Sequence, residues 1–190
     1  DEKGIARRIS CACCDVALEP VRVLRKAIDF FASRDQDERR VELVELERLA
    51  ALVQESAGVR FARRPDGMAI LGLKSGVQTR RPQIARAALE SVACFIRRAL
   101  ADLAGEGAVA ELYISGPAAR NGVLLEIIAA VCGVTVVRSE ISDAVAYGAA
   151  MRAAQEDGEQ LPRPERKRFN PTMPASQREE LYARWLAAAE

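Results

Sequence analysis

The chain has 190 residues, which is enough for one domain with a sizeable hydrophobic core or for one domain with appended pieces. Its 28 Lys and Arg residues nearly balance its 27 Asp and Glu residues and form no basic stripe, so we expect no nucleic-acid partner. Histidine is absent, which excludes Ser-His and Cys-His nucleophile systems, histidine general bases and most zinc sites.

Targeting and redox signals point to a cytoplasmic protein with no membrane partner. No apolar run approaches the ~20 residues that span a bilayer, and residues 1–3 (DEK) do not begin a secretory signal. The five cysteines, an odd number with apolar neighbours, favour reduced thiols over a disulfide framework. Cys11, Cys13 and Cys14 could seed a metal site, but strand alternation turns Cys14 away from the other two, so we interpret them as thiols.

The first third of the chain predicts two strands and a helix. Residues 5–14 and 16–23 are expected to be short strands, the second of them interrupted by Pro20, which is tolerated at a strand end or edge. The alternative for the second strand is a helix that already runs over 21–34. From 38 to 55, apolar residues recur near helical spacing and predict a helix.

The middle of the chain alternates between strands and helices. Gly58 is expected to end the preceding helix, and "MAILGLK" (68–74) is a strand candidate. Pro82 suits the first turn of a long amphipathic helix over 82–104. A strand over 111–115, a helix over 118–132, a strand over 134–138 and a helix over 141–155 follow. This order predicts that the strands at 111–115 and 134–138 are parallel neighbours, in one sheet with those at 6–14 and 68–73.

The tail differs in composition from the rest. Residues 157–168 are charged and contain proline, so we expect a solvated connector, and Ser176-x-x-Glu179 is a capping box that would open a final helix. Tyr182 and Trp185 share one face of that helix, and we interpret them as docking the tail rather than stacking on a base. The predicted organisation is therefore a domain over 1–156, followed by a connector and a docked helix over 157–190.

The turn after the strand at 111–115 is the candidate ligand site. Gly116 lets another group approach the backbone, and a helix that begins near Ala118 would point free N–H groups into the same space. Asn121, on the first turn, could donate and accept hydrogen bonds there, and we expect its replacement hardly to affect folding. The alternative is that Gly116-Pro117 is only a turn and Asn121 a surface residue. Neither the P-loop motif nor Gly-x-Gly-x-x-Gly is present.

Three stretches resemble one family in combination. "ISGPAARNGVLLEIIAAVCGVTVVRSEISDAVAYGAAMRAA" (114–154) resembles the carboxyl-terminal domain of the FGGY carbohydrate kinases, with its strand, glycine turn, Asn, apolar helix, strand and Gly-Ala-Ala helix. "ILGLKSGVQTRRPQIARAALESVACFIRRAL" (70–100) resembles the stretch before it. The tail "PTMPASQREELYARWLAAA" (171–189) is similar to the final Tyr-x-x-Trp helix of the glycerol kinases within this family.

The resemblance implies an actin-like, ribonuclease-H-like ATPase domain, the second of two, with a mixed sheet and helices on both faces. ATP would lie in the cleft between the domains, with Mg²⁺ as its companion in the complete enzyme. Asn121 would be the adenine-contacting residue, and Gly116 the first glycine of the turn beneath the nucleotide. The second glycine is Pro117 here, which has no N–H to donate.

Other positions depart further from the family. The loop that covers the phosphates is reduced to "RFARRPDGMAILGL" (60–73), and the catalytic Asp and the Gly-Thr-Gly turn are expected upstream of Asp1. The available carboxylates, Asp15, Asp29 and Asp66, do not lie in the matching motif. Phosphoryl transfer needs positioning, metal and a base, so the isolated chain is predicted to be inactive.

Two short motifs have alternative interpretations. Arg63-Arg64 could bind phosphate where the loop is lost, although a solvated pair is the interpretation that we favour. The small residues 148–150 (GAA) could approach a ligand, although we expect them to pack their helix tightly on a sheet.

Three hypotheses for function follow. The first is the ATP-side domain of a glycerol-kinase-like carbohydrate kinase that transfers the γ-phosphate of ATP to a polyol or sugar hydroxyl. Its amino-terminal kinase domain would bind most of the acceptor. The second is a degenerate, non-catalytic interaction or regulatory module, which Pro117 favours. The third is a free-standing α/β nucleotide-binding domain. Homo-oligomerisation is left open by the sequence.

Overall fold

The computed structural model describes residues 43–64, 67–74, 79–104, 109–115, 117–139, 141, 144–158 and 165–189. The predicted strands at 5–14 and 16–23, the alternative helix at 21–34 and the cysteines at 11, 13 and 14 lie outside these ranges. Gly116, Asp15, Asp29 and Asp66 also lie outside them. None of the helices in the described part is long and apolar enough to cross a bilayer.

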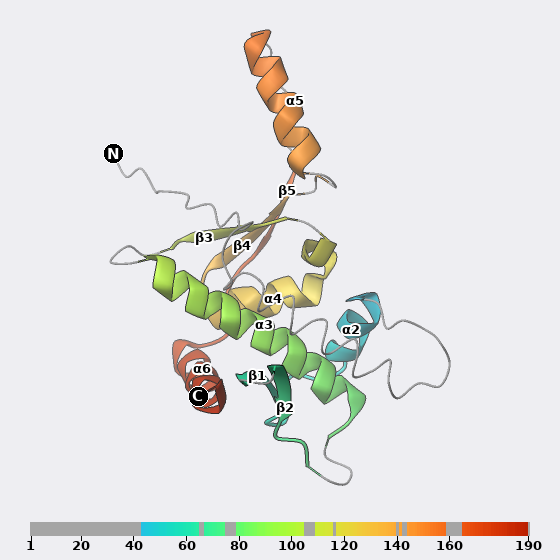
Figure 1. Cartoon of the computed structure of the whole chain (residues 1–190), viewed down its shortest axis with the longest axis vertical. Helices are drawn as coiled ribbons and strands as arrows, with labels where there is room; N and C mark the ends of the chain where they lie inside the picture. The colour runs from blue at the N-terminus through green and yellow to red at the C-terminus, as the bar shows by residue number, and fades with distance from the viewer. Residues whose placement is uncertain are drawn as a thin grey trace.

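The described elements alternate along the chain much as the sequence predicts (Figure 1). In order they are α2 (Leu43–Ala50), β1 (Arg60–Arg64), β2 (Gly67–Leu71), α3 (Arg81–Ala104), β3 (Glu111–Ile114), the 3₁₀ turn η2 (Pro117–Arg120), α4 (Gly122–Cys132), β4 (Thr135–Ser139), α5 (Ala144–Glu156), β5 (Arg166–Phe169) and α6 (Ala175–Ala189). The long helix expected from Pro82 is α3, and its bounds agree with the prediction to within one residue.

A mixed sheet in the order β3-β4-β5 forms one layer of the fold. β3 and β4 are parallel and adjacent, with Leu112 opposite Val136, and this confirms the predicted pairing. β5 runs antiparallel to β4 and places Phe169 opposite Val136. These three side chains lie in one row across the strands and are all buried, so that this face of the sheet belongs to the core.

β2 does not join that sheet, contrary to the prediction for residues 68–73. It pairs instead with β1 in a separate antiparallel hairpin, in which Phe61 lies opposite Ile70. β1 (RFARR) was predicted only as the remnant of a loop, because three of its five residues are arginines and the polar–apolar alternation of a strand is weak. Its consecutive Phe61 and Ala62 are both fully buried, which is what holds the strand in place.

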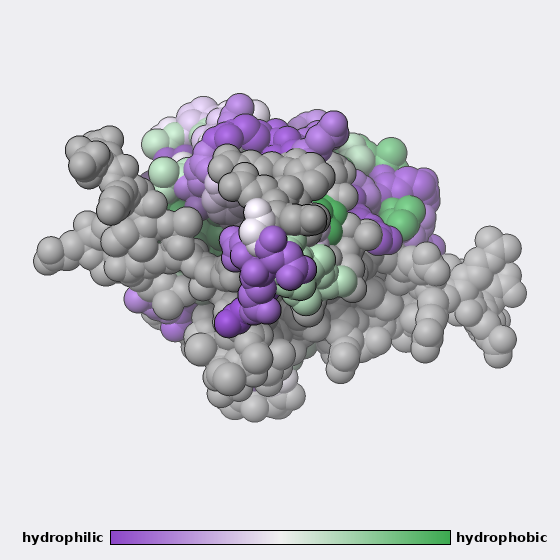
Figure 2. All heavy atoms as spheres, turned by 90° about the horizontal axis from the view of Figure 1, so that it is seen from above, coloured by the Kyte–Doolittle hydropathy of each residue, from purple (hydrophilic) through white to green (hydrophobic). Residues whose placement is uncertain are grey.

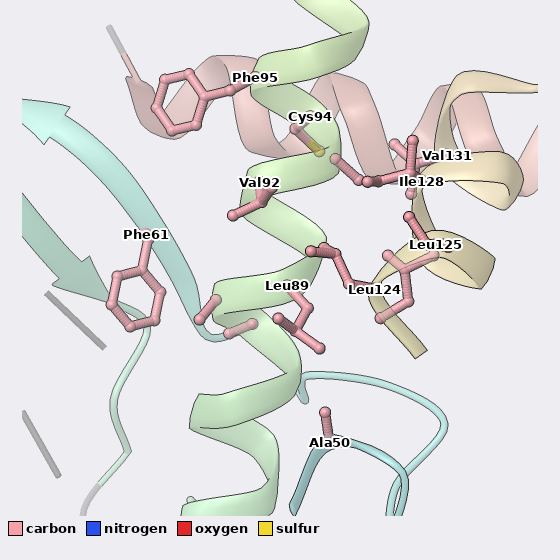
Figure 3. Packing of buried hydrophobic residues seen from close by; sticks show 14 of the residues in the cluster. Ala50, Phe61, Leu89, Val92, Cys94, Phe95, Leu124, Leu125, Ile128 and Val131 are labelled. Atoms are coloured by element: carbon pink, nitrogen blue, oxygen red, sulfur yellow. The ribbon is translucent and has the colours of Figure 1, made fainter. Parts of the chain in front are cut away.

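The core lies between α3 and α4 (Figure 3). Leu89 of α3 and Leu125 and Ile128 of α4 are buried and lie in the space between the two helices, whereas the buried Val92 points to the side of α3 that faces Phe61. The other side of α3 carries the β1–β2 hairpin, and α4 packs on β4. α4 therefore links the three-stranded sheet to the rest of the core, and the start of α4 lies beside the end of β3.

The carboxyl-terminal helix packs on this core through its aromatic residues. Trp185 is 2% exposed, lies edge-on to Phe95 with ring centroids 4.6 Å apart, and donates from Nε1 to the Phe61 carbonyl oxygen at 3.1 Å. The Tyr182 ring stacks on the Trp185 ring with the ring centroids 6.0 Å apart, and the Arg97 guanidinium lies over the Tyr182 ring. The docking role expected for the two aromatic residues is confirmed.

The predicted capping box at Ser176 is wrong. α6 begins one residue earlier, at Ala175, and the Arg178 amide bonds to the Pro174 carbonyl, so that Ser176 lies inside the first turn. Glu179 forms an ion pair with Arg97 of α3 at 2.5 Å. The Glu179 side chain, which the capping box would place at the start of the helix, therefore binds Arg97 of α3 instead.

Two other predicted elements differ in extent, and one predicted packing role is contradicted. α2 ends at Ala50, well before Gly58, because the amides of Leu52 and Val53 bond three residues back and Leu52 is exposed. Residues 166–168, expected in a solvated connector, form most of β5, although their side chains are exposed. The predicted sheet-packing role of residues 148–150 is wrong, because all three are exposed on α5.

α5 projects from the rest of the molecule (Figure 1). Figure 2 shows the molecule from that end, and there the described surface is mostly hydrophilic, with hydrophobic areas that are small and separate. Large apolar side chains that are exposed in the described part include Tyr113 of β3 and Met151 of α5.

Candidate functional site

The link from β3 to α4 is tighter than the sequence predicts. Pro117 begins the 3₁₀ turn η2, the Asn121 amide bonds to the Ala118 carbonyl at 3.2 Å, and α4 starts only at Gly122. The predicted helix start at residue 118 is thus four residues too early. Proline suits the first position of a helical turn because an N–H at that position would have no partner within the turn, and this explains why the chain tolerates Pro117.

Asn121 is the N-cap of α4. Its backbone is extended, with φ −78° and ψ 101°, and its Oδ1 accepts a hydrogen bond from the Leu124 amide at 2.7 Å. The residue is only 3% exposed. The interpretation of Asn121 as a surface residue is therefore wrong, and the capping bond leads us to predict that replacing Asn121 lowers stability.

The other half of the Asn121 amide group is unsatisfied. Nδ2 is buried, and no hydrogen-bond partner for it lies among the residues that the structure describes. A buried donor without an acceptor is uncommon in folded proteins and calls for an explanation. Because Oδ1 is held by Leu124, the group left for a ligand is a donor, and a ring nitrogen is one of the acceptors that fit it.

A carboxylate of α2, which is distant in the sequence, binds the N-terminus of α4. Glu47 Oε1 accepts from the Gly122 amide at 2.7 Å and from the Val123 amide at 3.3 Å. With Leu124 capped by Asn121, the first three amides of the helix all have partners. The expected free N–H groups are therefore not available. Sequence reasoning missed Glu47 because 75 residues separate it from Gly122 and no local motif connects them.

The arrangement fits one part of ATP and not another. The unpartnered Nδ2 of Asn121 can meet the acceptor edge of an adenine ring. A phosphate at the same place would meet the Glu47 carboxylate instead of open amides. In the described ranges, no three His, Cys, Asp or Glu side chains are grouped in a way that could hold a metal ion. These residues therefore fit the base, and they give no fit for the phosphates or Mg²⁺.

A cavity lies at a different place in the fold. A cavity of about 460 Å³ lies between residues 54–60, α3 and α6, and neither Pro117 nor Asn121 lines it. Glu90 does line it, and burial raises the pKa of Glu90, although the Arg86 guanidinium bonds to it at 2.9 Å. No buried polar atom without a partner faces this cavity in the described part, so the candidate site remains at the start of α4.

Arg63 and Arg64 end β1, opposite Met68 and Gly67 of β2. Arg63 is exposed and Arg64 half-buried. Neither is brought to Asn121 by a described contact. That the two arginines are solvated and do not bind phosphate stays a prediction.

Comparison with known proteins identifies the family. Residues 32–156 match the FGGY family of carbohydrate kinases, C-terminal domain. The glycerol kinase of Dechloromonas aromatica (strain RCB) is 33% identical over 192 residues, covering 90% of this chain and 36% of that protein. The glycerol kinase of Thermus brockianus is 38% identical over 166 residues, covering 77% of this chain and 33% of that protein.

Solved structures agree on the fold. A Plasmodium falciparum glycerol kinase with ADP superposes with a TM-score of 0.68 at 18% identity, covering 91% of this chain and 36% of that one. A Bifidobacterium adolescentis xylulose kinase gives 0.63 at 21% identity, covering 89% and 34%. The predicted actin-like, ribonuclease-H-like α/β fold is confirmed, and the chain spans about a third of the length of these relatives. The chain therefore belongs to the FGGY family of carbohydrate kinases and corresponds to the carboxyl-terminal domain of its members.

Proposed function

We propose that this chain is the ATP-side domain of a glycerol-kinase-like enzyme that transfers the γ-phosphate of ATP to a polyol or sugar hydroxyl. The observation that carries the proposal is the buried Nδ2 of Asn121, which has no partner among the described residues and lies beyond the carboxyl end of β3, where ligands of α/β sheets bind. The similarity to glycerol kinases supports the choice of acceptor class.

The proposed division of labour gives this chain the adenine base. Asn121 donates from Nδ2 to a ring nitrogen, and Pro117, which has no N–H, contributes no backbone donor. The partner is an amino-terminal kinase domain, which supplies the catalytic Asp, Mg²⁺ and most of the acceptor site. ATP supplies the phosphoryl group.

The decisive experiment uses the protein completed by its amino-terminal domain. Asn121→Ser keeps a capping oxygen and removes Nδ2, so we expect a roughly five- to ten-fold loss of ATP affinity by calorimetric titration, the effect of one neutral hydrogen bond. Unchanged ATP affinity in a folded Asn121→Ser variant contradicts the proposed role. The isolated 190-residue chain should form no ADP in a glycerol-dependent manner once host kinases are excluded.

The second candidate is a degenerate, non-catalytic module. Two observations favour it: Pro117 occupies the position of a family glycine, and only residues 65 and 66 separate β1 from β2 where the family has its phosphate loop. The same titration distinguishes the two candidates. A completed protein that folds and fails to bind ATP supports the degenerate module and rules out the kinase.

A further inference from the structure

The N-terminus of a helix ordinarily attracts anions. Its first amides have no partners within the helix, and the aligned peptide dipoles place a partial positive charge there. α4 has 11 residues and follows a parallel strand, β3, after the 3₁₀ turn η2, and helices that follow parallel strands commonly bind phosphate at their N-termini. Any ligand that enters by this turn meets whatever occupies those amides.

In this protein the amides are occupied from within. A single oxygen of Glu47 accepts from both Gly122 and Val123, at 2.7 and 3.3 Å. Hydrogen bonds to an ionised carboxylate are among the stronger ones in proteins, and the negative charge also complements the helix dipole. A second anion would have to displace Glu47 or approach it against like-charge repulsion.

Glu47 is held in place by the core. Its neighbours Leu46, Leu49 and Ala50 are buried, which fixes the face of α2 that meets α4. The carboxylate is thus a built part of the site rather than a surface side chain that happens to lie near it.

Asn121 provides independent evidence for the chemical class of the ligand. The residue is only 3% exposed, and its Nδ2 has no acceptor among the described residues. We infer that Glu47 is a specificity-determining residue that closes the start of α4 to phosphate and other anions and leaves the Asn121 donor for the uncharged edge of a base. The identity of that base as adenine rests on the proposed function, whereas the exclusion of anions does not.

The experiment uses inorganic sulfate as the anion and the full 190-residue chain. Backbone amide signals of Gly122 and Val123 are followed by NMR during a sulfate titration at constant ionic strength. In the wild-type chain we expect no saturable shift. In Glu47→Ala, where the amides are released, we expect a saturable shift and sulfate binding at least about ten-fold tighter than in the wild type.

Glu45→Ala is the matched control. Glu45 lies on the same helix and pairs with Arg48 at 2.7 Å, so that its loss changes the net charge equally without uncapping α4. Glu45→Ala should behave like the wild type. A sulfate response at these amides in Glu45→Ala as large as that of Glu47→Ala contradicts the inference, and so does a folded Glu47→Ala that shows none.

The wild-type titration decides the matter even if Glu47→Ala does not fold. A saturable sulfate shift at Gly122 and Val123 in the wild-type chain overturns the inference, because it shows that the amides are open. The outcome is separate from that of the ATP titration: Asn121→Ser with unchanged ATP affinity removes the proposed function and leaves the exclusion of anions standing.

Discussion

At the scale of single residues, Asn121 has one observed role and one proposed role, and substitution can separate them. Oδ1 caps α4, and Nδ2 is the proposed donor to a ligand. Asn121→Ala loses the cap and should lower the free energy of unfolding by about 1 kcal/mol. Asn121→Ser should stay within about half of that loss because serine is also a good N-cap. Urea denaturation measures both variants. Equal stability of Asn121→Ala and the wild type would contradict the capping role.

Glu90 should make stability depend on pH. Burial raises the pKa of Glu90 above its ordinary value, so that the folded state binds a proton more tightly than the unfolded state does. The resulting stabilisation is complete below the ordinary glutamate pKa and is lost as the pH rises through the raised value.

Glu90→Gln tests this dependence. Glutamine can still accept from Arg86 and does not ionise, so the variant should gain stability relative to the wild type as the pH rises from acidic to neutral. Thermal unfolding across that range measures the difference. A difference that is flat with pH, or that falls, contradicts the expectation.

At the scale of elements, two glycines should respond to alanine in opposite ways. Gly133 ends α4 in the left-handed region, at φ 70°, and its amide bonds to the Ala129 carbonyl. A Cβ there would also crowd the Arg178 side chain. Gly133→Ala should therefore cost about 1 kcal/mol of stability.

Gly148 provides the matched control. It lies inside α5, is exposed, and has open space where a Cβ would be added. Gly148→Ala should stabilise the chain or leave it unchanged, by at most about 1 kcal/mol, because alanine is the better helix former. Chemical denaturation compares the two variants. The same sign for both substitutions would mean that the ends of α4 and the middle of α5 are not as described.

At the scale of the whole molecule, Trp185 fastens the carboxyl-terminal helix to the hairpin and to α3. Trp185→Ala should cost about 3–5 kcal/mol because it empties a filled site in the core. Trp185→Phe leaves the Phe61 carbonyl without its donor and should cost about 1–3 kcal/mol. Tyr113→Ala, at a side chain that is 51% exposed, is the control and should change the stability much less. Equal effects at Trp185 and Tyr113 would refute the docking.

Local sequence signals correctly predicted the structural features that depend on residues close together in the chain. Pro82 and the apolar face behind it fixed α3, and the strand–helix–strand order around α4 fixed the parallel pairing of β3 with β4. β1 was not predicted as a strand because most of its residues are arginines, and only its pairing with β2 makes it a strand. At the site, Asn121 became a candidate through its place on the first turn of a predicted helix, and the family resemblance gave it a role, whereas the contact from Glu47 depends on how α2 packs. Such contacts are set by tertiary structure and leave no mark on neighbouring residues.

The bond from Trp185 to Phe61 joins positions 124 residues apart, and this constrains how the protein is made. During synthesis from the amino-terminal end, β1 emerges long before the helix that covers it. Until Trp185 arrives, the Phe61 carbonyl lacks its partner and the apolar side of the hairpin faces solvent or a chaperone. Closing so long a loop costs entropy before any contact offsets it. A nascent chain that stops short of Trp185 would thus present an uncovered strand, which is the kind of surface that promotes aggregation and attracts quality control.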